Sequence, residues 1–507
     1  MKIKSLFIGV ITIMSATIST TSCASNSVEN TEKVEPIVFQ YSEVQKKIAE
    51  KAIKLDNENN PIVAHKFTAD PAVLVYNDTI YIYGTNDSQQ LEYTLGEEDN
   101  GYNRINTLNV FSSKDMRNWT DCGEIKVGGS SGAAKWARNS WAPAIAMKNI
   151  DGKDKFFLYF ADSANGIGVL TADSPTGPFT DPLGHALITR SMPNMNGVYW
   201  LFDPAVFVDD DGTGYIYFGG GVDKDVEHPK SSRCAKLGDD MISLAERPVE
   251  IDAPFVFEDS GINKVGNKYY YSYCSNWSSR DGAVGPHIPG VASICYMSSD
   301  SPLGPFKYEG ETLLNPGKYF GPWGNNHHWI FQMNGKWYIA YHCQTMEKKV
   351  GFTKGGYRNL YLNEFAVNED GFWPEQGRQN ITNAGPAQLK AFNPYETVKA
   401  ATLRSSKDVV VTSEKVISIK DRAFLRLDGV DFSKGAEKIT VKAAAKGEGS
   451  IAVYLDSNTK GTLIGEVAVN GEGTFEAALN YPETAEKLHN LYFVFSGEVA
   501  MEEWKIN

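Results

Sequence analysis

Three acidic residues and one histidine stand at corresponding points of a phrase that recurs along the sequence. Asp70, Asp203 and Glu258 begin three copies of the phrase, and His327 begins another. Carboxyl groups that converge on one small gap can hydrolyse a glycosidic bond, because one protonates the leaving oxygen while another activates water or attacks the anomeric carbon. A third acid nearby raises the pKa of the proton donor through repulsion between like charges. These residues are therefore the candidate catalytic group.

The recurring phrase has the pattern of a β-hairpin. Its clearest copy, Phe202–Gly220, has a short alternating strand, a turn of Asp and Gly, and a second strand rich in aromatic residues. The other four copies are Ala69–Gly84, Trp141–Phe160, Phe257–Cys274 and Asn326–His342. Five such units, with further strand patterns between them, predict a five-bladed β-propeller over residues 61–388, because each blade needs its neighbours to bury its faces.

The first strand of each blade lines the central channel of a propeller. Aligned on the repeat, the channel position holds Asp70, Ala142, Asp203, Glu258 and His327. A single Asp before Pro more often caps a strand than performs catalysis, but three acids at equivalent positions favour a shared site. The aromatic residues that flank these positions are candidates both for stacking on a sugar ring and for core packing. They are Trp141, Trp200, Phe202, Phe257 and Trp329.

The composition is that of a globular protein whose main partner is not a polyanion. The chain has 507 residues and a formal net charge of −13, which argues against nucleic acid or an anionic membrane as its principal ligand. The five cysteines after Cys23 are odd in number and lack metal-type spacing. Three of them lie in strand patterns and are expected to be buried thiols. These are Cys274, Cys295 and Cys343.

The N-terminus has the pattern of a secretory signal. Lys2 and Lys4 precede an apolar run that is too short to span a membrane comfortably, and small residues then lead to Cys23. This resembles a bacterial lipoprotein cleavage site. We therefore expect removal of residues 1–22, lipidation of Cys23, and tethering of the secreted chain to the bacterial envelope, in the periplasm or at the cell surface. Residues 23–60 predict a tether with a short helix within Ser42–Leu55.

The repeated phrase stops after Gly385, and a different pattern follows. Residues 395–507 contain about eight short strand patterns, which predict a β-sandwich of the jelly-roll type. These patterns read VVVTS, ISIKD, RAFLRL, KITVKAAA, SIAVYL, LIGEVAV, TFEAAL and LYFVFS.

The motifs of the propeller region together resemble glycoside hydrolase family 43, which comprises five-bladed propeller arabinofuranosidases and xylosidases. The matching motifs are ADPAVLV with Asp70, WAPAIA, FDPAVFVDDDG with Asp203, FEDSGINKVGNKYYYSYCSN with Glu258, and NNHHWIF with YHCQ. The resemblance implies an inverting mechanism with Asp70 as the general base and Glu258 as the general acid. It also implies that Asp203 tunes the pKa of Glu258 and orients it, and that no organic cofactor takes part.

Further site residues follow from the same resemblance. Arg358, in GGYRNLYLNEF, matches a family position near the substrate and the acids, although a structural ion pair would also explain it. Members of the family often hold a calcium ion near a channel histidine, which makes His327 a candidate ligand. His328 is the alternative, because neighbouring strand residues point to opposite sides; a histidine that only hydrogen-bonds in the channel is the other interpretation. The predicted substrate-binding residues are Trp141, Phe202, His327 and Arg358.

The C-terminal region resembles a family 6 carbohydrate-binding module in three stretches, Gly429–Ala445, Ser450–Val469 and Leu488–Asn507. It departs from the family where VKAAT replaces an acidic opening and where Phe424 replaces a common Trp. Sugar binding and a purely structural role are therefore both open for this domain.

The combination of this propeller with this module indicates an enzyme that removes α-L-arabinofuranosyl side chains from arabinoxylan, a plant cell-wall polysaccharide. A β-xylosidase or an arabinanase on the same propeller is the near alternative. A surface glycan-binding protein without catalytic activity is the alternative from another class, and its expected sign, the loss of an axial acid, is absent.

Overall fold

The computed structural model describes residues 37–283, 288–368, 371–372, 379–482 and 486–507. The predicted signal peptide and Cys23 lie outside these residues. No helix in the described part of the chain is long and apolar enough to cross a membrane. The helix expected within Ser42–Leu55 is present as α1 (Glu43–Lys51), and it begins at a capping box formed by Ser42 and Gln45.

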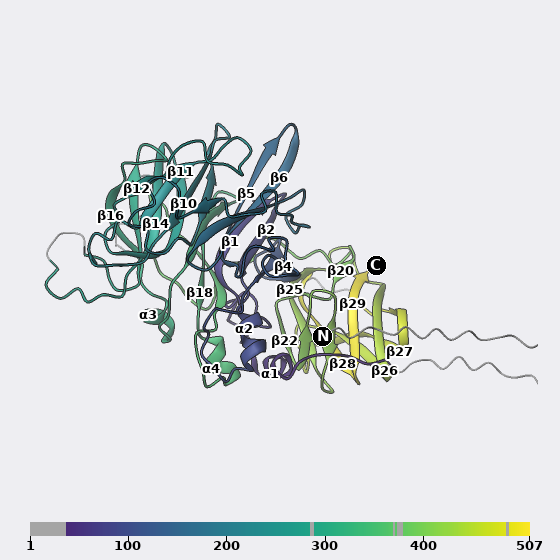
Figure 1. The fold of residues 1–507 in the computed structure, drawn as a ribbon. Coiled ribbons are helices and arrows are strands. Elements are labelled where there is room, and N and C mark those ends of the chain that lie inside the picture. Colours follow the sequence, from purple (N-terminus) through teal and green to yellow (C-terminus); the bar gives the residue numbers. More distant parts are fainter. Residues whose placement is uncertain (1–36, 284–287, 369–370, 373–378, 483–485) are drawn as a thin grey trace, which may run out of the picture. The chain divides into compact units, whose positions relative to one another are not determined.

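Five antiparallel sheets follow one another along the chain and form the blades of a propeller (Figure 1). The first strand of each blade contacts the first strands of the neighbouring blades, so these strands lie on the inside. Blade one holds β1 (Ala69–Tyr76), β2 (Thr79–Thr85), β3 (Thr107–Ser113) and β4 (Trp119–Lys126); blade two holds β5 (Trp141–Ile150), β6 (Lys153–Ala161), β7 (Gly166–Ala172) and β8 (Ile188–Thr189). Blade three holds β9 (Ala205–Val208), β10 (Gly214–Gly219), β11 (Ser232–Lys236) and β12 (Val249–Ile251); blade four holds β13 (Val256–Val265), β14 (Lys268–Ser275), β15 (Ile294–Ser299) and β16 (Lys307–Leu313). Blade five holds β17 (His328–Met333), β18 (Lys336–Cys343) and β19 (Asn359–Glu364).

The propeller core lies between the blades. Five clusters of buried side chains each combine residues from two neighbouring blades, so every blade buries both faces against its neighbours. The ring closes where the segment before β1 runs along β19: Ile62 N–H donates to Leu360 O at 2.9 Å, and Thr68 N–H donates to Arg358 O at 2.7 Å. The fold class predicted for this region is confirmed.

Of the two roles left open for Trp329, the structure shows core packing. Trp329 lies on β17 next to His328, is partly buried against three of the inter-blade clusters, and does not line the pocket that holds the acids. The three cysteines predicted to be buried thiols, Cys274, Cys295 and Cys343, are buried and unpaired.

The inner strands share a backbone irregularity that corrects the alignment of the repeat. In β1, β5 and β13 the pairing register shifts between Ala69 and Ala72, Trp141 and Ala144, and Glu258 and Gly261. The residue after the first of each pair has a left-handed backbone, as does the equivalent residue of blade three: φ is 50° at Asp70, 36° at Ala142, 69° at Asp259 and 48° at Asp203.

Blade four therefore carries Asp259, not Glu258, at the position of Asp70 and Asp203. The alignment from sequence was wrong by one residue, because this copy has Ser where Pro marks the position in three other copies. Glu258 occupies the preceding position, which corresponds to Phe202 in blade three.

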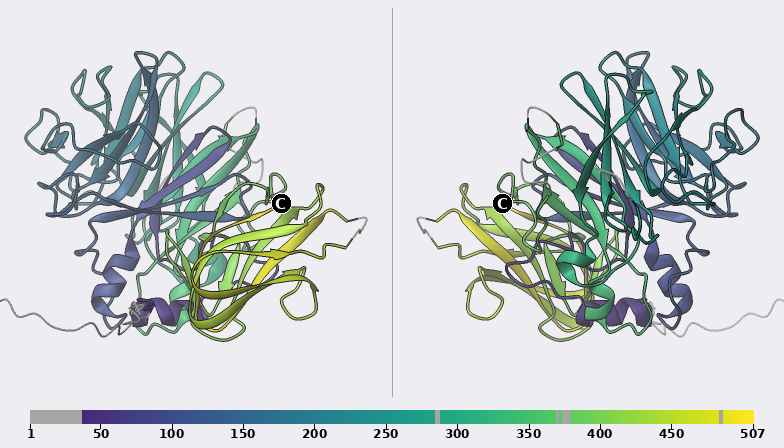
Figure 2. Two further views of the ribbon diagram at one scale, coloured as in Figure 1. Left: turned by 90° about the vertical axis from the view of Figure 1, so that its right-hand side faces the viewer. Right: turned by 90° about the vertical axis from the view of Figure 1, so that its left-hand side faces the viewer.

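The C-terminal region is a β-sandwich, as predicted (Figure 2). Its strands are β20 (Val398–Lys399), β22 (Ser405–Lys407), β23 (Val409–Val411), β24 (Val416–Ser418), β25 (Phe424–Asp431), β26 (Lys438–Leu455), β27 (Thr462–Ala478), β28 (Leu488–Ser496) and β29 (Val499–Ile506). KITVKAAA and SIAVYL form the single strand β26, because the glycines between them make a bulge rather than a turn. LIGEVAV and TFEAAL likewise form the single strand β27.

Candidate active site

The three acids converge on one pocket at the end of the propeller where the inner strands begin. The pocket has a volume of about 460 Å³, which suits a small ligand. Its polar lining comes from blades one, three, four and five, and the predicted aromatic residues Trp141, Trp200, Phe202 and Phe257 complete it. The polar and charged lining residues are Asp70, Thr85, Tyr102, Asp203, Glu258, Asn325, His327 and Arg358. All four residues predicted to bind substrate therefore face this pocket.

Asp70 lies beside a guanidinium group. Arg358 Nη1 donates to Asp70 Oδ1 at 2.9 Å, and the backbone N–H of Asp70 donates to His342 Nδ1 at 3.1 Å. Burial alone would raise the pKa of Asp70, but the Arg358 guanidinium, together with His342 and His327, outweighs burial and holds that pKa well below its usual range. Asp70 is therefore a carboxylate at every pH at which the protein would work.

The other two acids lie in the opposite electrostatic situation. Burial and then repulsion from Asp203 raise the pKa of Glu258 well above its usual range. Burial and then repulsion from Asp70 raise the pKa of Asp203. Neither side chain has a cation as close as the one beside Asp70; Glu258 Oε1 accepts a hydrogen bond of 3.3 Å from the backbone N–H of Asn326. The pocket thus combines an ionised Asp70 with a Glu258 that keeps its proton because burial and the neighbouring carboxylates disfavour its ionisation, which is the division needed for a base and an acid.

His327 links the acids across the channel. Its Nδ1 lies 3.8 Å from Asp70 Oδ1 and 3.7 Å from Asp203 Oδ2, while its Nε2 lies 3.3 Å from Asp259 Oδ1. His328 is fully buried and points away from the pocket, so His327 is the histidine that faces it.

The surroundings of His327 do not form a calcium cage. Calcium binds six to eight oxygen ligands, whereas His327 offers one ring whose two nitrogens already face carboxylates. Among the described residues, no group of three or more His, Cys, Asp or Glu side chains is arranged to hold a metal ion. Calcium beside His327 therefore stays a prediction, and the reaction steps are assigned to the side chains of the pocket.

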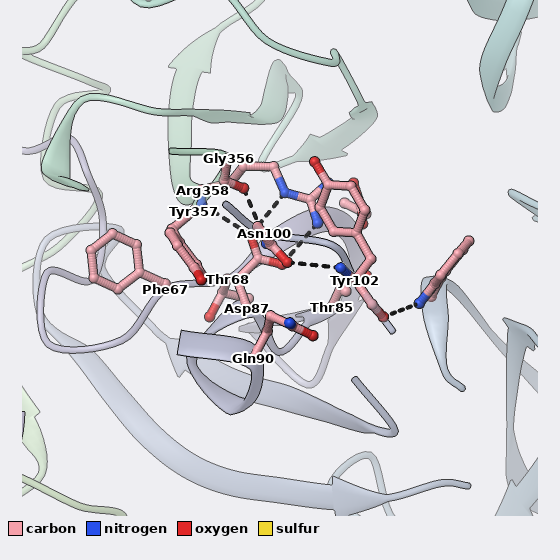
Figure 3. A network of polar contacts seen from close by, with 12 residues as sticks. Phe67, Thr68, Thr85, Asp87, Gln90, Asn100, Tyr102, Gly356, Tyr357 and Arg358 are labelled. Carbon is pink, nitrogen blue, oxygen red and sulfur yellow. Dashed lines mark hydrogen bonds and ion pairs between the residues drawn. The ribbon is translucent and has the colours of Figure 1, made fainter. Parts of the chain in front are cut away.

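Arg358 is held by a second acid that the sequence did not reveal. Asp87, at the start of α2 (Asp87–Thr94), accepts from Arg358 Nε and Nη2 at 2.8 Å each and from the Arg358 backbone N–H at 3.0 Å (Figure 3). Such a two-pronged contact fixes both the position and the orientation of the guanidinium. Both interpretations of Arg358 are therefore correct. Its Nε and Nη2 form a structural ion pair with Asp87, and its Nη1 contacts Asp70 in the pocket.

Tyr102 lines the pocket and was not predicted from the sequence. The Arg358 guanidinium lies 4.9 Å from the centre of the Tyr102 ring, and Trp141 Nε1 donates to Tyr102 O at 3.0 Å. Asn100 Oδ1 accepts from Tyr102 N–H at 3.0 Å, and Asn100 Nδ2 donates to Gly356 O at 3.1 Å, which ties the connection between β2 and β3 to the loop before Arg358 (Figure 3). Both Asp87 and Tyr102 lie in that connection, outside the repeated phrase.

Removing the Arg358 side chain is expected to destabilise the fold. Arg358→Ala leaves Asp87 buried without its cation, and breaking a buried pair from one side costs about 3–5 kcal/mol in free energy of unfolding. The double variant Arg358→Ala/Asp87→Asn should lose less than the sum of the single variants, since no charge is then stranded. Denaturant unfolding followed by fluorescence measures both. Arg104→Ala, which removes an exposed arginine, is the control; an equal loss in Arg358→Ala and in this control would contradict the prediction.

A second cavity of about 530 Å³ lies away from the acids. It is lined by the turn between β3 and β4 and by residues 390–402, on the side of blade one that meets the sandwich. None of the three axial acids lines it, and Asp115, its buried carboxylate, is already hydrogen-bonded to Asn118, Ser113 and Gln388. The chemistry therefore belongs to the smaller pocket.

Comparison with known families covers most of the chain. The model of glycosyl hydrolases family 43 matches residues 58–374, and the model of carbohydrate binding module (family 6) matches residues 395–507. Both matches agree with the resemblances seen in the sequence.

Individual relatives match over nearly the same span. The chain is 44% identical over 471 residues to an arabinoxylan arabinofuranohydrolase of Paenibacillus polymyxa, covering 88% of this chain and 73% of the relative. It is 43% identical to one of Bacillus subtilis (strain 168), covering 87% of this chain and 89% of the relative. The crystal structure of a family 43 arabinoxylan arabinofuranohydrolase from Bacillus subtilis, in complex with cellotetraose, superposes with a TM-score of 0.84 at 40% identity, covering 91% of this chain and 99% of that chain.

Proposed function

The chain belongs to family 43 of the glycosyl hydrolases, and from this premise we propose that it removes α-L-arabinofuranosyl side chains from arabinoxylan with inversion at the anomeric carbon. One observation carries the proposal: a single pocket joins an ionised Asp70 to a Glu258 that retains its proton. Hydrolysis of a glycosidic bond needs that pair of states and no cofactor.

Each of the three acids has a distinct part in the proposed reaction. Asp70 takes a proton from a water molecule as that water attacks the anomeric carbon. Glu258 donates its proton to the oxygen of the departing xylose unit, so the bond between that oxygen and the anomeric carbon breaks without forming an alkoxide. Asp203, whose repulsion helps to keep Glu258 protonated, does not bond to the sugar carbon. Water is thus added across the bond, and after product release Asp70 loses its proton to solvent while Glu258 takes one up, which restores the starting states.

The face around the pocket supports a polymeric substrate. Among the described residues, four aromatic side chains are highly exposed, and all four lie on connections that open at the pocket end of the blades. They are Tyr93, Tyr199, Trp277 and Trp323. Exposed aromatic rings gathered on one face are suited to sugar rings of a main chain, because their flat apolar surface stacks on pyranose rings.

Incubation with wheat arabinoxylan tests the proposal. The chain lacking residues 1–22 should release arabinose and no xylose, as resolved by chromatography. Proton NMR during the first turnovers should show the β-anomer of arabinofuranose first, which is the sign of inversion from an α-linkage. Release of xylose, or of linear arabinan fragments from arabinan, would replace the proposed substrate while leaving the acids in place. Retention of configuration would contradict the roles of Asp70 and Glu258.

The dependence of rate on pH follows from the two protonation states. The rate requires Asp70 ionised and Glu258 protonated, so kcat/KM should fall as pH rises through the pKa of Glu258, while the acidic limb lies at low pH. Asp203→Asn removes a negative group beside Glu258, lowers the pKa of Glu258, and should move the basic limb to lower pH. Asp211→Asn, at an exposed turn of the same blade, should leave the profile unchanged. An unmoved basic limb in Asp203→Asn would contradict the tuning role.

We also propose that Cys23 carries a lipid anchor, which would hold the enzyme at the bacterial envelope. The support is the pattern of Lys2, Lys4 and the apolar run that ends in small residues before Cys23. Radiolabelled palmitate supplied to expressing cells should label the wild-type chain and not Cys23→Ala, and the wild type should partition into detergent. Cys122→Ala, which removes a cysteine of blade one, is the control that should keep the label. Equal labelling of Cys23→Ala and the wild type would contradict the anchor.

A further inference from the structure

A hydrogen-bonded chain of three side chains lies beneath the pocket, and the mechanism above does not use it. Ser272 Oγ lies 2.8 Å from His328 Nε2, and His328 Nδ1 lies 2.5 Å from Asp259 Oδ2. The same order of groups activates a serine nucleophile in many hydrolases. Here all three side chains are fully buried and none lines the pocket, so none of them contacts a substrate. Their effect must pass through their neighbours.

Asp259 is the member that reaches the catalytic group. Its backbone N–H donates to Asp203 Oδ2 at 3.0 Å, and its carboxylate Oδ1 lies 3.3 Å from His327 Nε2. The same Oδ1 also accepts from the backbone N–H of His328 at 3.2 Å. One residue therefore holds an acid of the pocket with its main chain and a histidine of the pocket with its side chain.

The orientation of the His327 ring depends on this contact. With Nε2 directed at Asp259, the opposite nitrogen Nδ1 is placed between Asp70 and Asp203, at 3.8 Å and 3.7 Å. The ring thus acts as a spacer between the base and the second acid. A rotation of the ring would change the separation of two carboxyl groups on which the reaction depends.

The backbone at Asp259 and Gly261 has features that allow the close contacts of Asp259, His328 and Ser272. Asp259 has a left-handed backbone, with φ at 69°, a conformation that non-glycine side chains adopt at a cost in energy and that Asp tolerates better than most. Behind it, a Cβ atom on Gly261 would lie 2.4 Å from Ser272 Oγ and 3.1 Å from His328 Nε2, so only glycine lets the chain of side chains approach this closely.

We propose that Asp259 is a positioning residue for the hydrolytic reaction: anchored by His328 and Ser272, it fixes the His327 ring and Asp203 in the geometry that catalysis requires. This inference rests on the proposed function, since the reaction it assists is glycoside hydrolysis at the same pocket. Asp259 touches no substrate and is the fourth buried acid at the axis, next in sequence to the proton donor Glu258.

The alternative is that Asp259 only stabilises the fold, and the chain offers a matched control. Asp121 is also fully buried and also contacts a histidine, with 3.0 Å between its Oδ2 and His65 Nε2, but it lies on β4 outside the pocket. Asp259→Asn keeps the backbone donor and the size of the side chain. It replaces one carboxylate oxygen of Asp259 with an amide NH₂ group. That group then faces the N–H of His327 or His328, so one of these two rings must turn.

The test compares Asp259→Asn and Asp121→Asn for kcat and KM on p-nitrophenyl α-L-arabinofuranoside, for melting temperature, and for ring-nitrogen NMR signals of ¹⁵N-histidine protein. The His327 signals are assigned from a His327→Gln variant. We expect Asp259→Asn to lower kcat by about 10²-fold with little change in KM, because misplacement of catalytic groups by about 1 Å costs that much. Its His327 ring signals should shift. Asp121→Asn should change the melting temperature without either effect.

Two results would overturn the positioning role: an unchanged kcat in Asp259→Asn, or a fall in kcat that Asp121→Asn reproduces at an equal loss of melting temperature. A failure of the proposed function is recognised separately, because the wild type would then release no arabinose. In that case the ring signals decide: a shift confined to Asp259→Asn supports the positioning role, and unmoved His327 signals contradict it.

Discussion

Glu258→Gln is expected to stop the release of arabinose from arabinoxylan while leaving the fold intact. The amide has no proton to give to the departing xylose oxygen, and loss of a general acid typically costs about 10²–10⁴-fold in rate. The substitution should not destabilise the protein, because it removes a buried acid whose ionisation is already disfavoured by burial and by Asp203. Circular dichroism and the melting temperature check the fold, and a coupled assay for arabinose measures the rate.

The leaving group gives this prediction its sharpest form. In an aryl arabinofuranoside the nitrophenolate leaving group departs without protonation. Glu258→Gln should therefore lose far less activity on that substrate than on arabinoxylan. The ratio of the two losses therefore reports the proton-donor role itself rather than general damage to the site. Equal losses on both substrates would show that Glu258 acts in some other way, and full activity on arabinoxylan would remove it from the mechanism.

The propeller could be predicted from the sequence because the same hairpin pattern occurs once in every blade. Each copy of the hairpin phrase combines alternating residues, a turn and an aromatic strand, and the five copies constrain one another. The alignment was wrong only in blade four, where Ser260 replaces the proline that marks the channel position in other copies. Backbone dihedral angles and strand register place Asp259 at that position.

Site residues within the repeat could be predicted, and those outside it could not. Asp70 and Asp203 were visible because repetition singles them out, whereas Glu258 rested on the resemblance to family 43, since the repeat position of blade four holds Asp259. Asp87 and Tyr102 lie in the connection between β2 and β3, which occurs once and has no counterpart to compare it with. Their positions depend on contacts with Arg358, about 270 residues away in the chain for Asp87, and no local pattern encodes a pairing at that distance. Trp329 shows a related limit, since the pattern left both a sugar-facing role and core packing open, and only the structure shows it packed against the inter-blade clusters.

Asp70→Asn is expected to abolish hydrolysis of every arabinoside, whatever its leaving group. The reason is that Asn cannot accept the proton of the attacking water, and loss of a general base costs about 10²–10⁴-fold in rate. The carboxylate is held ready for this task by Arg358, which lowers the pKa of Asp70 despite burial. In contrast to Glu258→Gln, a nitrophenol leaving group should give no relief, because the step that fails is the activation of water.

Azide separates the two acids by chemistry rather than by rate alone. Azide attacks carbon without giving up a proton, so it can replace water where the base is missing: the azide–carbon bond forms as the bond to the leaving oxygen breaks, and the nitrophenolate leaves without needing a proton. Added azide should therefore restore turnover of the aryl arabinofuranoside by Asp70→Asn and give β-L-arabinofuranosyl azide, the inverted product. Glu258→Gln should gain nothing from azide, since its water is already activated. An azide product from Glu258→Gln and none from Asp70→Asn would exchange the two roles.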